Sequence, residues 1–119
     1  VDQLFQCDGS GLSPANGVSA NFFVEMLTYM KSQSKYADVY FNSLPVSGES
    51  GTLKSILAKT ALHGKVHAKS GTIERVKCYV GYIEAKNRIL VFALMVNNPF
   101  GTSKDVTKKM EEFMLDIAK

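Results

Sequence analysis

The sequence of 119 residues lacks the long apolar run that a membrane-spanning helix needs. Its longest apolar stretch, Ile89 to Val96, has the length of a strand, whereas a helix that crosses a bilayer needs ~18 or more residues. The sequence also lacks a tract of one charge, because its 14 basic and 11 acidic residues are spread along the chain. Nucleic-acid-binding proteins usually cluster their basic residues. We therefore expect no transmembrane segment and no nucleic-acid partner.

Cysteine is also scarce, with Cys7 and Cys78 the two present. Their spacing matches none of the zinc-binding motifs. A disulfide in an oxidising compartment and two buried thiols both stay open, because the sequence does not supply the geometry that a disulfide requires. Hydrophobic residues make up 45% of the chain and charged residues 21%. These proportions are typical of one small globular domain and argue against disorder.

The N-terminal half of the sequence predicts a loop followed by helices. Residues 7–17 are rich in turn-forming residues and predict a loop. Ser19 is a suitable N-cap for a helix over residues 20–33, whose apolar residues recur at helical spacing. Two further helices are expected at Tyr36–Leu44 and Thr52–Leu62. The buried side of the last one would consist of Leu53, Ile56, Leu57 and Ala61.

The C-terminal half predicts three antiparallel strands and a final helix. Strand patterns cover residues 65–72, 77–84 and 89–96. The last strand is apolar on both faces, which is typical of a central strand with cover on each side. A helix is expected from Ser103 to Ile117, with a capping box formed by Thr102 and Asp105. The predicted fold is an α/β fold of the α+β type, with the C-terminal helix on one face of the sheet.

The tetrapeptide Lys69-Ser70-Gly71-Thr72 is the first candidate for a functional site. Alone it is weak evidence, because composition gives roughly one chance in twenty of such a match, and the plain alternative is a solvated lysine entering a strand. Its setting is more specific, since serine acyl enzymes of the penicillin-binding and β-lactamase type place such an element on a strand before a terminal helix. Strand alternation puts the two hydroxyls on one face, where they could hold a carboxylate.

Three other stretches of the sequence look like motifs of a known family and occur in the same order as in that family. They are Asp8-Gly9-Ser10-Gly11-Leu12-Ser13 with Asn16, Pro45-Val46-Ser47-Gly48-Glu49-Ser50-Gly51-Thr52-Leu53, and Val96-Asn97-Asn98. Together with the tetrapeptide, they resemble the class C low-molecular-mass penicillin-binding proteins, which are D-alanyl-D-alanine carboxypeptidases and endopeptidases. The resemblance covers nearly the whole chain. It implies the C-terminal portion of the serine β-lactamase/transpeptidase-like fold.

The resemblance also implies roles for individual residues. Lys69, Ser70 and Gly71 would form the catalytic K-S-G element, and the hydroxyls of Ser70 and Thr72 would bind the substrate carboxylate. The backbone N–H of Thr72 would be half of the oxyanion hole. Leu12 would line the pocket for the donor side chain. No metal or organic cofactor is implied.

The sequence departs from the family pattern in two respects. Pro14 stands where the family commonly has an arginine, so any contact of that arginine with an acidic group of the stem peptide is in doubt. The family motifs S-x-x-K and S-x-N are matched by Ser32-Gln33-Ser34-Lys35 and Ser19-Ala20-Asn21. One helix would separate the two serines by roughly 20 Å, whereas a nucleophile and its proton partner must lie within about 3 Å. We therefore expect the true motifs upstream, with residues 1–119 as the C-terminal part of the penicillin-binding domain.

The implied parent enzyme hydrolyses the D-Ala-D-Ala bond of peptidoglycan stem peptides through an acyl-serine, and it binds β-lactams. It would lie in the periplasm or elsewhere outside the cytoplasmic membrane, and this chain alone would be inactive. The strand at 89–96 would become a sheet edge, covered by the missing N-terminal part or by another copy of the chain. Two alternatives stay open. One is a non-catalytic module that binds stem peptides or β-lactams, and the other is a structural domain with a coincidental K-S-G.

Overall fold

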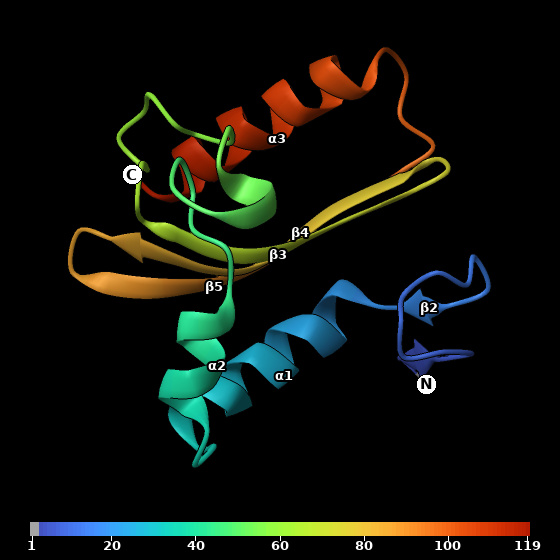
Figure 1. The fold of residues 1–119 in the computed structure, drawn as a ribbon, viewed down its shortest axis with the longest axis horizontal. Coiled ribbons are helices and arrows are strands. Elements are labelled where there is room, and N and C mark those ends of the chain that lie inside the picture. Colours follow the sequence, from blue (N-terminus) through green and yellow to red (C-terminus); the bar gives the residue numbers. More distant parts are fainter. Residues whose placement is uncertain (1–2) are drawn as a thin grey trace.

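The computed structural model describes residues 3–119. The chain forms a three-stranded antiparallel sheet with helices on both faces (Figure 1). Its strands are β3 (Val66–Ile73), β4 (Val76–Ala85) and β5 (Arg88–Asn97), in the order β3-β4-β5. The three predicted strands are therefore confirmed, each to within one residue at either end.

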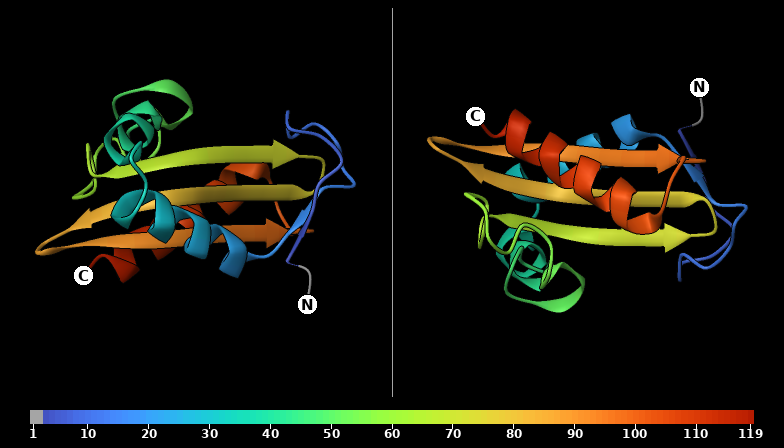
Figure 2. Two further views of the ribbon diagram at one scale, coloured as in Figure 1. Left: turned by 90° about the horizontal axis from the view of Figure 1, so that it is seen from below. Right: turned by 90° about the horizontal axis from the view of Figure 1, so that it is seen from above.

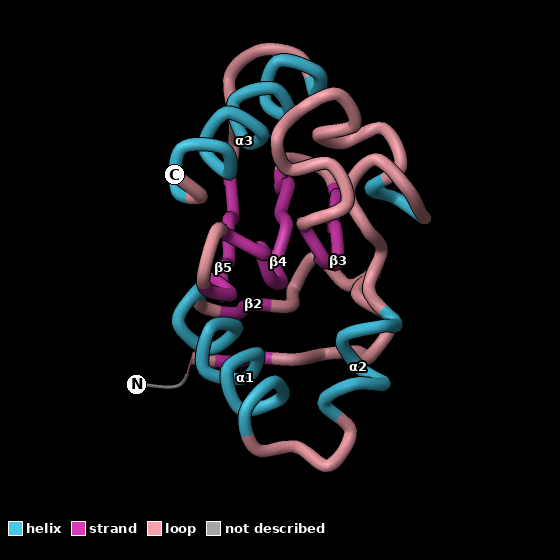
Figure 3. Tube along the Cα trace, turned by 90° about the vertical axis from the view of Figure 1, so that its left-hand side faces the viewer, coloured by secondary structure: helices cyan, strands magenta, loops and turns pink. Residues whose placement is uncertain are grey.

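The helices divide between the two faces of this sheet. α1 (Ala20–Ser32) and α2 (Ala37–Ser43) lie on one face, and α3 (Ser103–Ile117) lies on the other (Figure 3). None of the helices in residues 3–119 combines the length and the apolar character that a bilayer crossing requires. The predicted position of the C-terminal helix on one face of the sheet is confirmed.

Two of the helices start at the predicted N-cap residues, whose side chains form capping hydrogen bonds. Ser19 Oγ accepts the backbone N–H of Phe22 at 3.0 Å. Thr102 and Asp105 form a capping box in which each side chain accepts the other's backbone N–H. Caps of this kind satisfy N–H groups that have no partner in the first helical turn. Both predicted helix starts are therefore confirmed.

Residues 52–62 do not form the predicted third helix. A short 3-10 helix, η1 (Gly51–Leu53), is followed by a series of turns. Leu57 has a φ of 56°, a left-handed conformation that does not fit in a right-handed helix. Its N–H donates to the Glu111 carboxylate of α3 at 2.6 Å, which fixes this conformation. The predicted apolar side is buried at Leu53, Ile56 and Leu57 but exposed at Ala61.

The sheet separates two apolar clusters, one on each face. The cluster beneath α3 contains Leu53, Leu57, Val66, Ala68, Tyr79, Ile83, Phe92, Val106, Met110 and Met114. The cluster beneath α1 and α2 contains Leu27, Leu44, Val80 and Tyr82. The buried hydroxyl of Tyr82 donates to the carbonyl oxygen of Leu27 at 2.7 Å. Burial of apolar surface on both faces therefore holds the helices to the sheet.

β5 is apolar on both faces but lies at an edge of the described sheet, whose central strand is β4. Phe92 belongs to the cluster beneath α3, and Val91 packs against the cluster beneath α1 and α2. Helices cover both faces of β5, so the apolar pattern does not require a strand on each side of it. The strand at 89–96 is therefore a sheet edge in residues 3–119, as expected for this chain, and the expected cover on both faces is present. Its central position in a larger sheet stays a prediction.

Candidate functional site

The tetrapeptide Lys69–Thr72 lies in the second half of β3, at the edge of the sheet opposite β5. Ser70 and Thr72 line a groove on the α3 face. Gly71 faces the other way, directly opposite Cys78 of β4. The structure therefore separates the two hydroxyls from Lys69 and Gly71 as strand alternation requires.

The backbone of β3 has an open edge at this tetrapeptide. Segment 45–47 closes the first half of the edge, where the N–H of Ala68 donates to the carbonyl oxygen of Pro45 at 3.0 Å. Because outward-pointing groups alternate along a strand in an antiparallel ladder, the N–H and C=O groups of Ser70 and Thr72 point the same way. No backbone–backbone bond occupies them in residues 3–119. An extended peptide can add to β3 at this point.

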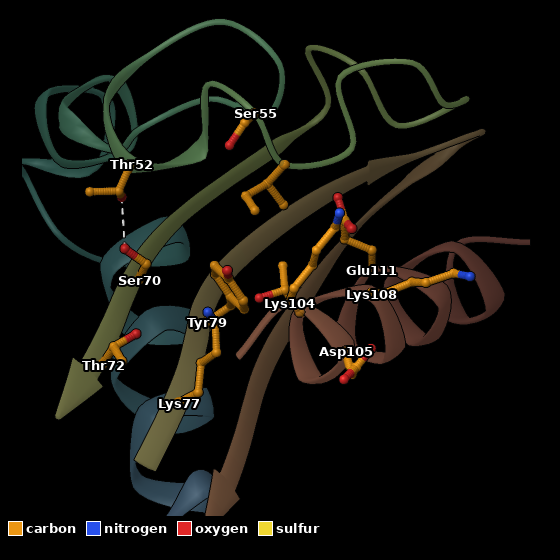
Figure 4. A pocket seen from close by; sticks show the side chains of 12 residues that line it. Thr52, Ser55, Ser70, Thr72, Lys77, Tyr79, Lys104, Asp105, Lys108 and Glu111 are labelled. Carbon is orange, nitrogen blue, oxygen red and sulfur yellow. Dashed lines mark hydrogen bonds between the residues drawn. The ribbon is translucent and has the colours of Figure 1, made fainter. Parts of the chain in front are cut away.

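A third hydroxyl joins those of Ser70 and Thr72. Ser70 Oγ donates to Thr52 Oγ1 at 2.7 Å (Figure 4). Thr52 belongs to η1, and its own hydroxyl hydrogen is left free for another acceptor. On the strand itself, the ammonium group of Lys69 donates to the carbonyl oxygen of Ser70. The contact between Thr52 and Ser70 was not predicted from the sequence. The position of Thr52 in the family-like stretch 45–53 was the signal that could have indicated it.

The sulfur of Cys78 fills the space beside Gly71. A Cβ atom at Gly71 would lie 2.8 Å from Cys78 Sγ, which is too close for unstrained contact. Burial raises the pKa of the Cys78 thiol, while the ammonium group of Lys69 acts to lower it. Cys78 and Cys7 are both free, so the structure contains no disulfide between them, and Cys7 is exposed rather than buried.

The groove on the α3 face has a volume of about 930 Å³. It lies between β3, β4, the turns after η1, and α3 (Figure 4). Its polar lining consists of Thr52, Ser55, Ser70, Thr72, Lys77, Tyr79, Lys104, Asp105, Thr107, Lys108 and Glu111. The carboxylate-binding hydroxyls predicted from the sequence therefore open into a larger polar space, which the sequence did not reveal.

Loop 7–17 is organised around the carboxylate of Asp8. The donors to this carboxylate are Ser10 Oγ at 2.8 Å, Gly11 N at 3.1 Å, Ser13 N at 3.1 Å and Asn16 Nδ2 at 2.8 Å. The hydrogen bond from Asn16 makes the largest contribution to a lowered pKa of Asp8. Two short paired strands, β1 (Leu4–Phe5) and β2 (Gly17–Val18), close the base of the loop.

This loop lies beside the end of the sheet where β3 turns into β4 (Figures 1 and 2). Leu12 is 76% exposed on it. No hydrogen bond joins the loop to Lys69–Thr72 in the described part of the chain. The structure therefore brings Ser70 and Thr72 together with Thr52, and it leaves Leu12 on a separate, exposed loop.

The two sequence matches to nucleophile motifs lie at opposite ends of α1. Ser19 is the N-cap, and Ser32 is the last residue of this 13-residue helix. Such a helix separates its ends by roughly 20 Å. The hydroxyl of Ser32 donates to the carbonyl oxygen of Thr28 at 2.7 Å, as a serine within a helix commonly does. These residues do not form a catalytic pair.

Residues 1–119 match the profile of the D-Ala-D-Ala carboxypeptidase 3 (S13) family. The chain is 38% identical over 99 residues to a D-alanyl-D-alanine carboxypeptidase of Actinomadura sp. (strain R39), a match that covers 79% of this chain and 18% of the relative. It is 26% identical over 126 residues to the penicillin-sensitive carboxypeptidase A of Dictyostelium discoideum, with 96% of this chain and 23% of that relative covered. The chain thus spans less than a quarter of the length of these curated relatives.

A crystal structure of penicillin binding protein 4 from Haemophilus influenzae shares the fold. The TM-score is 0.86 at 21% sequence identity, over 98% of this chain and 28% of that chain. A second structure of that protein, in complex with a β-lactam, superimposes with a TM-score of 0.83 over 94% of this chain. The predicted α+β fold is therefore confirmed.

Proposed function

Since the chain belongs to the D-Ala-D-Ala carboxypeptidase 3 (S13) family, we propose that it is the C-terminal part of a penicillin-binding domain. The nucleophilic serine and its lysine would lie in the upstream part. The whole enzyme would hydrolyse the D-Ala-D-Ala bond of peptidoglycan stem peptides, and β-lactams would bind at the same site. We place this activity outside the cytoplasmic membrane, in the cell-wall compartment.

The open edge of β3 is the observation that carries this proposal. The backbone groups of Ser70 and Thr72 point away from the sheet, beyond the stretch that segment 45–47 covers. A stem peptide would bind there in an extended conformation. The N–H of Thr72 would then donate to the oxygen of the scissile carbonyl as half of the oxyanion hole. One donor of this kind contributes a factor of about 10²–10³ to kcat.

The side chains of the same strand would recognise the end of the substrate. The hydroxyls of Ser70 and Thr72 would donate to the terminal carboxylate, and the charge of Lys69 would support the field around it. The hydroxyl of Thr52 accepts from Ser70 in this structure. With a carboxylate bound, the single hydrogen of Ser70 would go to the carboxylate, and the Thr52 hydroxyl would donate to Ser70 Oγ and hold it in place. Gly71 would leave room for the substrate backbone beside the strand. Leu12 would line the pocket for the donor side chain from its exposed loop.

The chemistry would proceed in two steps. In the first, the upstream serine hydroxyl attacks the carbonyl carbon of the penultimate D-alanine while a base takes its proton. The amide C–N bond breaks, and the leaving amine receives that proton. In the second, water attacks the resulting ester, which releases the shortened peptide and restores the serine. Residues 1–119 would hold and polarise the substrate in both steps.

Labelled penicillin tests this proposal directly. The full-length gene product should form a covalent adduct at an upstream serine, and the isolated 119-residue chain should form none. Replacement of Lys69 with Ala should cost ~2–4 kcal/mol of transition-state stabilisation, or about 30- to 1,000-fold in acylation rate. Ser70→Ala should cost less, because Thr72 can still donate to the carboxylate.

Other outcomes of the same experiment would point elsewhere. An unchanged acylation rate in Lys69→Ala would show that the site assignment is wrong. An adduct at Ser32, found by peptide mass mapping, would place the nucleophile inside this chain. Reversible penicillin binding without an adduct in the full-length protein would favour the non-catalytic binding module.

The outer edge of β5 requires a partner in the proposed enzyme. Within residues 3–119, no strand pairs with this edge, and Ile89 at its start is 45% exposed. After Arg88, the edge from Ile89 to Val96 carries no charge or proline, and a long apolar edge of this kind invites strand addition. We propose that the upstream part of the enzyme covers it, or that another copy does so when the chain is isolated. Size-exclusion chromatography with light scattering tests this, because a dilution-resistant monomer of the 119-residue chain would contradict it.

A further inference from the structure

The groove beside Ser70 and Thr72 extends beyond the residues that the proposed function uses. Three lysines line this extension: Lys77 on β4 and Lys104 and Lys108 on α3. Lys77 lies opposite Thr72 in the strand register, and its ammonium group donates to Ser103 Oγ at 3.2 Å. The ion pairs found among residues 3–119 all involve other residues. Three positive charges therefore line the groove without a carboxylate in contact.

The two carboxylates in the same lining already accept hydrogen bonds from the protein. Asp105 accepts the N–H and the hydroxyl of Thr102, at 3.0 Å and 2.6 Å. Glu111 accepts the N–H of Leu57 at 2.6 Å. The capping contact with Thr102 is also the main cause of the lowered pKa of Asp105. Both acids have structural partners, so the lysines are the charged groups best placed to meet a ligand.

We propose that this groove binds a second negative charge, carried by the side chain of the residue that the substrate releases. The proposal rests on the proposed function, which places the terminal carboxylate of that residue at Ser70 and Thr72. Its side chain then starts at the mouth of the groove, and a volume of about 930 Å³ accommodates an acidic side chain or a short acidic peptide branch. The lysines that line the groove would attract the charge of that group.

Two peptide substrates that differ only in this charge provide the test. One ends in D-Ala-D-Glu and the other in D-Ala-D-Gln, so the leaving side chains have nearly the same shape. The full-length gene product should cleave the D-Glu peptide with about fivefold higher kcat/KM, as expected for a few solvent-exposed charge pairs. This preference should fall as the salt concentration rises, because the charges are exposed.

Matched variants assign the preference to the groove. The double replacement Lys104→Gln and Lys108→Gln should reduce the ratio of the two kcat/KM values to below about twofold. Lys109→Gln is the control, because Lys109 lies on α3 next to Lys108 but outside the groove lining, and it should leave the ratio unchanged. The thermal unfolding midpoint of each variant checks that its fold is intact.

The outcomes separate this inference from the proposed function. Loss of the D-Glu preference in the double variant, with the ratio kept in the control, supports it. A wild-type ratio near one, or a ratio that the double variant retains, overturns it while hydrolysis of a D-Ala-D-Ala peptide still supports the proposed function. A protein that cleaves none of these peptides and forms no penicillin adduct overturns both.

Discussion

The packing of Cys78 against Gly71 leads to a prediction that needs no knowledge of the substrate. Replacement of Gly71 with Ala would place a Cβ atom 2.8 Å from Cys78 Sγ. Gly71 is not among the residues with positive φ, so alanine is compatible with the local backbone. The cost of Gly71→Ala should therefore come from crowding alone. Overpacking of this kind typically costs about 1–3 kcal/mol.

A second replacement, Cys78→Ala, removes the crowding atom. Alone it should cost about 1 kcal/mol, because it deletes a half-buried sulfur. In the double variant, the new methyl group at position 71 occupies space that the sulfur has left. We expect the double variant to be more stable than the sum of the single effects by ~1–2 kcal/mol. The sign of this coupling distinguishes direct contact from a general effect on the strand.

The assay is a double-mutant cycle on the free energy of unfolding, measured by urea denaturation of the full-length gene product. Gly17→Ala is the control, because a Cβ atom at Gly17 meets nothing within 4 Å, and it should be nearly neutral. Additivity of the Gly71 and Cys78 effects to within about 0.5 kcal/mol would refute the reasoning. It would mean that the sulfur does not limit the space beside Gly71.

Two further predictions concern the hydroxyl contact at the site and the N-terminal loop. Thr52→Val removes the hydroxyl that contacts Ser70 and that would donate to Ser70 Oγ once the Ser70 hydrogen goes to the substrate carboxylate. It should raise KM for D-Ala-D-Ala peptides about three- to tenfold, from a hydrogen bond worth about 0.5–1.5 kcal/mol. Thr52→Ser should retain the wild-type KM, and equal KM values for the valine and serine variants would count against a positioning role. The lowered pKa of Asp8 means that its hydrogen bonds stabilise the loop above the ordinary carboxyl pKa of about 4, and that this stabilisation is lost as the pH falls through the lower folded value. The amide resonances of Gly11 and Ser13 should therefore titrate below pH ~4, and a midpoint above that value would contradict their hydrogen bonds to Asp8.

Local patterns were sufficient to predict much of the fold. The three strands follow from alternation and turn residues, and the start of α3 follows from Thr102 and Asp105, because a capping box involves residues that are close in sequence. The helix predicted at residues 52–62 was wrong because its conformation depends on a residue far away in the sequence. Its apolar spacing is helical, but the backbone at Leu57 is held by Glu111, which lies 54 residues away in the chain. Single-sequence patterns contain no information on such a contact.

The features of the candidate site also differ in whether the sequence could predict them. Alternation along β3 correctly separates Ser70 from Lys69, since it depends on strand geometry alone. The contact from Thr52, the sulfur of Cys78 beside Gly71 and the groove beneath α3 depend on how distant elements pack. The apolar pattern of β5 correctly indicates cover on both of its faces, which the helices provide, but it does not fix the place of the strand in the sheet order.

The half-closed edge of β3 has a consequence for the direction and length of any peptide that binds there. A peptide antiparallel to β3 runs with its C-terminal end toward Ala68. At that residue the carbonyl group of Pro45 already takes the N–H that the next peptide residue would use. A chain that continued past Ser70 would collide with segment 45–47. A chain that ends there meets the Ser70 hydroxyl with its partner Thr52, and the Lys69 ammonium group at the Ser70 carbonyl. The open part of the β3 edge therefore accepts a peptide whose chain ends beside Ser70. Free C-termini fit there, and internal segments of a longer polypeptide do not.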